Sequence, residues 1–94
     1  IGYYGGMEYV ITDKQALANI AANVASLRDS RSRYWLAHAV GTYPINVTRI
    51  ENCESMPGSG LLARIAEVLG TTTDALLSPD ASKYQPPKIF SRTA

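Results

Sequence analysis

The chain has 94 residues, which is enough for one small domain. Hydrophobic residues make up 46% and charged residues 18%, and the formal net charge is only +1, so the total charge does not indicate a nucleic-acid binder. A single cysteine, Cys53, excludes an intramolecular disulfide, and a single histidine, His38, excludes a zinc site built from cysteines and histidines. We therefore expect no cofactor and no metal.

No apolar run approaches the roughly 20 residues that a membrane helix needs, and no secretory signal is visible. We therefore expect no membrane partner and a reducing cytoplasm as the compartment. Residues 1–11 are expected to form an N-terminal extension. Met7 is a candidate native start, which would make residues 1–6 a remnant of cloning, and both alternatives stay open.

Helical spacing of apolar residues begins after Ile11. Thr12 is expected to cap the first helix, with Gln15 completing a capping box. The helix is expected to end at Arg28 or Asp29. Its apolar face is expected to consist of Leu17, Ile20, Ala21, Val24 and Leu27.

Two shorter helices, joined by a tight turn, are expected next. Ser32 is the predicted cap of a helix over 33–40, which Gly41 ends. Pro44 suits the first position of the following helix, over 44–52, because its missing N–H would be unpaired there. The residues expected to point inward are Leu36, Ala39, Val40, Val47 and Ile50, with Trp35 partly buried.

A loop rich in glycine and proline, 54–60, separates these helices from a fourth and a fifth. The fourth is expected to begin near Ser59 or Gly60 and to stop at Gly70. The fifth is short: it starts in the run of threonines at 71–73 and ends near Leu77. Their core-facing residues are expected to be Leu62, Ile65, Ala66, Leu69, Leu76 and Leu77.

The expected fold is all-α: a compact five-helix domain over 12–78, flanked by short extended or flexible termini. Residues 79–94 combine prolines with polar residues, which predicts a linker or C-terminal tail. Two extended stretches, 9–11 and 88–90, are candidates for short strands, although a single hairpin is marginal alone.

The segment from Ser26 to Ile50 has a local net charge of +3, because four arginines face one acid, Asp29. A local basic patch is the electrostatic sign of a nucleic-acid binder. The exposed side of helix 44–52 also carries the mixture of side chains that base edges in the major groove require. Asn can bond adenine, Arg can bond guanine, and Ile can touch a thymine methyl group.

Four pieces of sequence fall in one register: Leu36 to Gly41, Val47 to Asn52, Pro57, and Leu61 to Gly70. In this order and spacing they resemble the lambda-repressor-like helix-turn-helix family, which includes phage repressors, Cro and XRE-type proteins. The resemblance covers roughly residues 17–77. It implies that helix 33–40 positions the domain and that helix 44–52 enters the major groove as the recognition helix.

The resemblance also implies roles for single residues. Those that would face base edges are Tyr43, Pro44, Ile45, Asn46 and Arg49. Those that would contact DNA phosphates are Arg31, Ser32, Arg33, Thr42, Thr48 and Asn52. Glu51 matches a glutamate that pairs with an arginine of the first helix, and Arg28 is its expected partner in a structural salt bridge.

Three residues depart from the family pattern. Cys53 replaces the usual glycine after Glu-Asn, so Asn52 or Cys53 must adopt any left-handed conformation there. Pro44 and Ile45 replace polar residues common at the start of the recognition helix. The target DNA sequence therefore cannot be carried over from a relative.

The expected function is that of a transcriptional repressor that binds a palindromic operator in double-stranded DNA as a homodimer. No catalytic residue and no enzyme activity are expected, because no triad and no phosphate-binding glycine loop is visible. Two alternatives stay open. An antitoxin would repress its own operon and bind a protein partner through residues 79–94, and a helical protein-interaction module would have no role on DNA.

Overall fold

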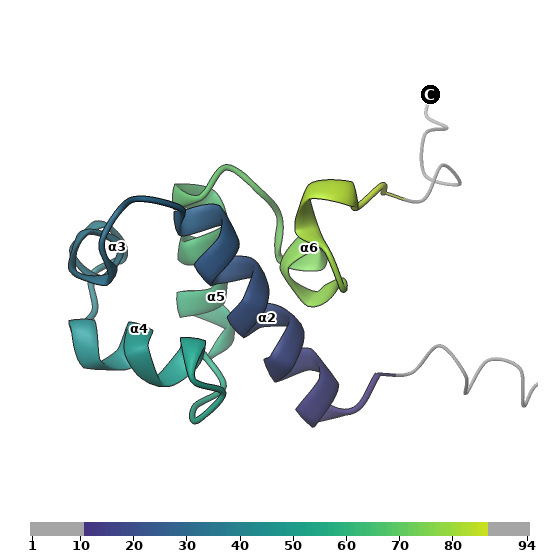
Figure 1. Cartoon of the computed structure of the whole chain (residues 1–94), viewed down its shortest axis with the longest axis horizontal. Helices are drawn as coiled ribbons and strands as arrows, with labels where there is room; N and C mark the ends of the chain where they lie inside the picture. The colour runs from purple at the N-terminus through teal and green to yellow at the C-terminus, as the bar shows by residue number, and fades with distance from the viewer. Residues whose placement is uncertain (1–10, 87–94) are drawn as a thin grey trace, which may run out of the picture.

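The computed structural model describes residues 11–86, and in this part of the chain the regular structure is all helical, with no strand (Figure 1). Five α-helices are followed by one short 3-10 helix: α2 Asp13–Arg28, α3 Arg33–Val40, α4 Pro44–Glu51, α5 Ser59–Val68, α6 Thr73–Leu77 and η1 Ala81–Lys83. The predicted all-α class with five helices is confirmed for these residues. The candidate strand 88–90 lies outside the described residues. So does the candidate strand 9–11, apart from its last residue, Ile11.

Polar side chains cap the start of three of the α-helices. Thr12 Oγ1 accepts the backbone N–H of Gln15 at 3.1 Å, and Gln15 Oε1 accepts the backbone N–H of Thr12 at 2.9 Å, which completes the predicted capping box. The hydroxyls of Ser32 and Thr72 each accept a backbone N–H three residues further on, at 2.9 and 3.1 Å. These bonds satisfy amide groups that have no partner inside the first turn of a helix.

Residues with positive φ follow four of the helices, and the first is Asp29 after α2, with φ of 57°. Gly41 and Gly70 follow α3 and α5 with φ of 78° and 74°. After α4 the left-handed residue is Cys53, with φ of 61°, whereas Asn52 stays at φ −92°. The alternative left open between these two residues is thereby settled, and a non-glycine side chain occupies a conformation that favours glycine.

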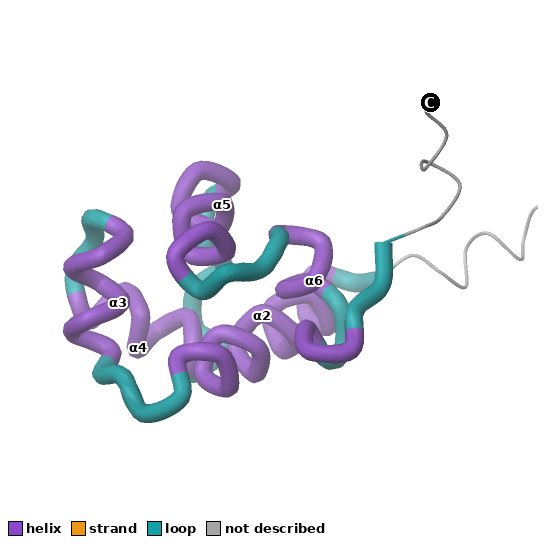
Figure 2. The backbone as a smooth tube through the Cα atoms, turned by 90° about the horizontal axis from the view of Figure 1, so that it is seen from above, coloured by secondary structure: helices purple, strands orange, loops and turns teal. Residues whose placement is uncertain are grey.

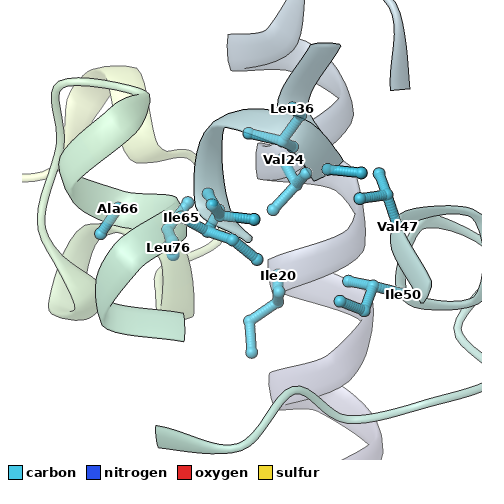
Figure 3. Close-up of a cluster of buried hydrophobic side chains, with 10 residues drawn as sticks. Ile20, Val24, Leu36, Val47, Ile50, Ile65, Ala66 and Leu76 are labelled. Atoms are coloured by element: carbon cyan, nitrogen blue, oxygen red, sulfur yellow. The ribbon is translucent and has the colours of Figure 1, made fainter. Parts of the chain in front are cut away.

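Helix α2 crosses the middle of the molecule, with α3 and α4 on one side of it and α6 on the other (Figures 1 and 2). It packs against α4 and α6, while α5 packs against α3 and α6. The buried side chains meet between these helices (Figure 3). The core cluster consists of Ile20, Val24, Leu36, Ala37, Val40, Val47, Ile50, Ile65, Ala66 and Leu76, and half-buried Trp35 and several leucines pack around it.

One predicted core position is wrong. Ala39 is exposed, and Ala37 is fully buried in its place. The reason is that α3 packs against both α4 and α5, so its buried stripe widens to include Ala37 between Leu36 and Val40. A spacing rule that assumes a single neighbouring helix does not anticipate this second contact.

The first residues of the predicted tail are bound to the domain by two asparagines of α2, which we call the asparagine clamp (Asn19 and Asn23). Asn23 is buried; its Nδ2 donates to the carbonyls of Leu76 and Ser78 at 2.9 and 2.7 Å, and its Oδ1 accepts the Ala81 N–H at 2.9 Å. Asn19 Nδ2 donates to the carbonyl at the end of α6 at 2.8 Å. The clamp fixes α6 and η1 against α2.

Candidate nucleic-acid interface

Helix α4 is anchored on one side and open on the other. Val47 and Ile50 are 1% and 2% exposed and join the core. Residues four positions apart share a helix face, so Ile45 and Arg49 lie together away from that anchor, and Asn46 lies between the two faces. Together with Tyr43 and Pro44 at the start of the helix, they form what we call the α4 surface: Tyr43, Pro44, Ile45, Asn46 and Arg49. Tyr43 and Ile45 are 73% and 54% exposed, Arg49 is exposed, and Pro44 and Asn46 are half-buried.

Asn46 is held by the turn that precedes its helix. Its Nδ2 donates to Thr42 Oγ1 at 2.8 Å, a bond that sequence analysis missed. An amide nitrogen carries two hydrogens, so this bond leaves one N–H and the amide oxygen of Asn46 for another partner. One donor and one acceptor are what an asparagine needs to bond the edge of adenine.

Arg31 and Ser32 lie between α2 and α3 and make contacts within the chain. The Arg31 guanidinium lies 4.2 Å from the centre of the Trp35 ring. Its Nε and Nη2 donate to the carbonyls of Arg28 and Leu27, at 3.2 and 2.9 Å. Arg31 thus caps the negative end of α2, just as Ser32 caps the start of α3.

Two arginines bind the carboxylate of Glu51. Arg28 holds it with two bonds, Nε to Oε2 and Nη2 to Oε1, each 2.8 Å long, so the expected ion pair is present. Arg33 adds a third bond, Nε to Oε1 at 2.8 Å. The exposed fractions differ, at 2% for the Glu51 side chain, 16% for Arg28 and 41% for Arg33. Sequence analysis placed Arg33 near a phosphate and missed this bond.

These ion pairs set the ionisation of Glu51. Burial raises the pKa of this carboxyl, but the hydrogen bonds from Arg28 and Arg33 and their positive charges outweigh burial, so the pKa lies below its ordinary value. In turn, the hydrogen bond to Glu51 raises the pKa of Arg28 against the opposing effect of burial. Glu51 is therefore an anion at neutral pH, and extending the basic segment to include it lowers the net charge from +3 to +2, since four arginines then face two acids.

An open hollow of about 280 Å³ lies where α3 meets the start of α4. It is lined by Tyr34, His38, Thr42, Tyr43 and Pro44. No carboxylate is among these lining residues, so the hollow adjoins the α4 surface without adding negative charge beside it.

The other predicted phosphate-contacting residues lie along or after α4, where Thr48 is half-buried and Asn52 is exposed. Sequence analysis missed Arg64 of α5, whose Nε donates to the Val40 carbonyl at 2.9 Å and so caps the end of α3. Three arginines therefore each join two helices in this region: Arg28, Arg33 and Arg64.

Two further observations concern other classes of site. Within residues 11–86 no group of three His, Cys, Asp or Glu side chains is placed to hold a metal ion. None of the helices in this range is both long and apolar enough to cross a bilayer.

Comparison with known proteins finds no match: no family model, no curated protein and no solved structure is similar to the chain.

Proposed function

We propose that the protein is a sequence-specific DNA-binding transcriptional regulator, a repressor of phage or bacterial type that works in the bacterial cytoplasm or nucleoid. In this proposal α3, the turn after it and α4 form a helix-turn-helix, and α4 is the recognition helix. One observation carries the proposal. Val47 and Ile50 hold α4 on one side, while Tyr43, Ile45 and Arg49 are exposed and the half-buried amide of Asn46 lies beside them.

The chemistry of the α4 surface suits the major groove, which is about 12 Å wide and admits one α-helix. Arg49 can donate two bonds to guanine, and Asn46 can bond adenine with the N–H and oxygen left by Thr42. Ile45 can pack on a thymine methyl group. Contacts of these three kinds would select a sequence, whereas contacts to phosphates would set the position of the protein on the duplex.

A homodimer would place two copies of α4 in successive major grooves on one face of the DNA. The half-sites of a palindromic operator would then lie about 34 Å apart. Phosphate contacts from Arg33, Thr48 and Asn52 would flank each recognition helix, and the exposed Tyr43 would lie at its entry. The spacing of the half-sites is therefore a geometric consequence of the proposal.

The proposal is tested by selecting bound duplexes from a random DNA pool and then measuring affinity by fluorescence anisotropy. The wild type should enrich a two-fold symmetric sequence, and its affinity should fall steeply as salt rises because bound phosphates release counterions. Arg49→Ala should weaken discrimination at one base pair of each half-site by about 1–3 kcal/mol. The matched control is Lys83→Ala, which removes one positive charge from η1, on the other side of α2.

The control should bind like the wild type apart from a small uniform effect of its charge. Failure to enrich any duplex would contradict the proposal and favour a protein-interaction module. Equal losses for Arg49→Ala and Lys83→Ala on every sequence would contradict the assignment of α4 as the recognition helix.

A further inference from the structure

The two arginines that bind Glu51 differ in the number of guanidinium nitrogens that make hydrogen bonds. Arg28 uses Nε and Nη2 on the carboxylate and Nη1 on the Arg31 carbonyl, at 2.6 Å. Arg33 uses Nε alone, and its side chain makes no other hydrogen bond within residues 11–86. The Arg33 side chain is also far more exposed, at 41% against 16% for Arg28, so its two terminal nitrogens are available to a further partner while its Nε is fixed.

The charges of this cluster do not cancel. Arg28, Arg33 and Glu51 together carry one net positive charge, and the most exposed member is Arg33. Arg28 already neutralises the carboxylate through two short bonds. The bond from Arg33 to Glu51 therefore orients the Arg33 guanidinium without abolishing the attraction of this cluster for an anion.

The position in the fold adds to this orientation. Arg33 is the first residue of α3, and Ser32 caps that helix. An anion bound by the terminal nitrogens of Arg33 would also lie near the positive end of the α3 dipole. Glu51 is the last residue of α4, so the bond ties the candidate anion-binding arginine directly to the recognition helix.

We propose that Glu51 is a positioning residue that holds the Nε of Arg33, so that the terminal nitrogens of Arg33 grip one DNA phosphate at a fixed distance from α4. This inference rests on the proposed function and adds a mechanism to it. The grip fixes how deeply α4 sits in the groove, because the carboxylate that orients Arg33 belongs to α4 itself.

The Arg33→Lys variant distinguishes a guanidinium held in a fixed orientation from a side chain that supplies only a positive charge. A lysine keeps the charge and has three N–H donors, but all three are on one nitrogen, so it cannot hold Glu51 and a phosphate with separate nitrogens in a fixed geometry. Arg33→Lys should therefore weaken binding about tenfold on every sequence, and Arg33→Ala should weaken it at least as much. The slope of log affinity against log salt should fall by about one unit in Arg33→Ala.

A double-mutant cycle assigns the effect to Glu51. In a Glu51→Gln background the fork loses its charged anchor, so replacing Arg33 by lysine should cost less than about threefold. Affinities are measured on the selected operator by anisotropy, at a temperature where circular dichroism shows each variant folded. Arg28→Lys is the structural control and should lower the melting temperature more than Arg33→Lys does.

Each outcome decides the matter. If Arg33→Lys binds like the wild type, Arg33 is a simple solvated cation and the inference is wrong, while the proposed function stands. If the tenfold loss persists unchanged in the Glu51→Gln background, Glu51 does not position Arg33. If the wild type binds no duplex, the proposed function fails first and this inference fails with it.

Discussion

The α4 surface and the asparagine clamp lie on opposite sides of α2 and use polar side chains differently. In the clamp, Asn23 is buried and its amide bonds only to groups of the chain itself. On the α4 surface, Tyr43 and Ile45 are mostly exposed, and Asn46 keeps part of its amide unused. Buried polar groups must find partners within the fold, whereas exposed ones can bind something else. The contrast separates side chains that hold the domain together from side chains that are available to a ligand.

The largest effect on folding is expected from Asn23→Ala. The change leaves the carbonyls of Leu76 and Ser78 and the N–H of Ala81 without their partner, so the free energy of unfolding should fall by about 3 kcal/mol. Urea unfolding followed by circular dichroism measures the loss. Asn19→Ala is the matched control and removes one half-buried bond, so its cost should be about 1 kcal/mol. Equal losses of unfolding free energy for the two variants would contradict the claim that the buried amide of Asn23 holds the domain together.

Glu51→Gln should have the next largest effect and should depend on pH. The folded pKa of Glu51 lies below its unfolded value of about 4.3, so the ionised carboxylate stabilises the fold above that value. This stabilisation is lost as the pH falls through the folded pKa. At pH 7 the substitution should lower the free energy of unfolding by about 2 kcal/mol, and the difference from the wild type should shrink toward pH 3.

Urea unfolding of the wild type and the variant at both pH values tests this expectation. Glu67→Gln, on an exposed position of α5, is the control and should follow the wild type at both. A gap between wild type and Glu51→Gln that stays constant with pH would show that the ion pairs around Glu51 do not stabilise the fold.

The Thr42→Val variant tests the α4 surface, where polar groups are available to a ligand. The valine keeps the shape of the threonine but removes the oxygen that holds the Asn46 amide, so Asn46 should lose its fixed orientation. Discrimination at the base pair that Asn46 contacts should fall by about 1 kcal/mol, with little change in the melting temperature. Anisotropy on single-base variants of the operator measures this. Thr73→Val, on α6, is the control and should leave discrimination intact.

The smallest effect is expected from Cys53→Gly, after the end of α4. Cys53 has φ of 61°, which glycine adopts without the steric cost of a Cβ atom, so the variant should be more stable by about 0.5–1 kcal/mol. Cys53→Ala should be nearly neutral, because alanine keeps the Cβ atom. A gain for both variants would locate the cost in the thiol rather than in the backbone.

Local signals predicted the helix boundaries well. Thr12, Ser32, Gly41 and Pro44 each act on the backbone within a few residues, so their effect is visible in the sequence, and the helices they bound agree with prediction to within a residue. The predicted inward positions Val47 and Ile50 are buried as well. Periodicity placed Ala39 inward by mistake where α3 meets two neighbours at once, and on α2 it missed Ala16, which is buried beside half-buried Leu17.

Long-range polar contacts could not be predicted in the same way. Asn23 lies in an otherwise apolar stripe, and nothing near it in sequence indicates that it bonds residues of α6 and η1. The bond from Arg33 to Glu51 likewise joins the start of α3 to the end of α4. Such partners depend on how the helices cross, and helix crossing follows from packing rather than from any local pattern. The role of the α4 surface in binding DNA stays a prediction.

The most direct test of the central claim is a nuclear magnetic resonance titration of the ¹⁵N-labelled protein with the selected operator duplex. The account predicts that the amide signals that shift most belong to residues 31–34 and 42–53, while those of the asparagine clamp, α6 and η1 stay almost unchanged. The largest shifts on α6 and η1, or no shift at a saturating concentration of the selected duplex, would contradict the claim that α4 is the DNA-binding helix.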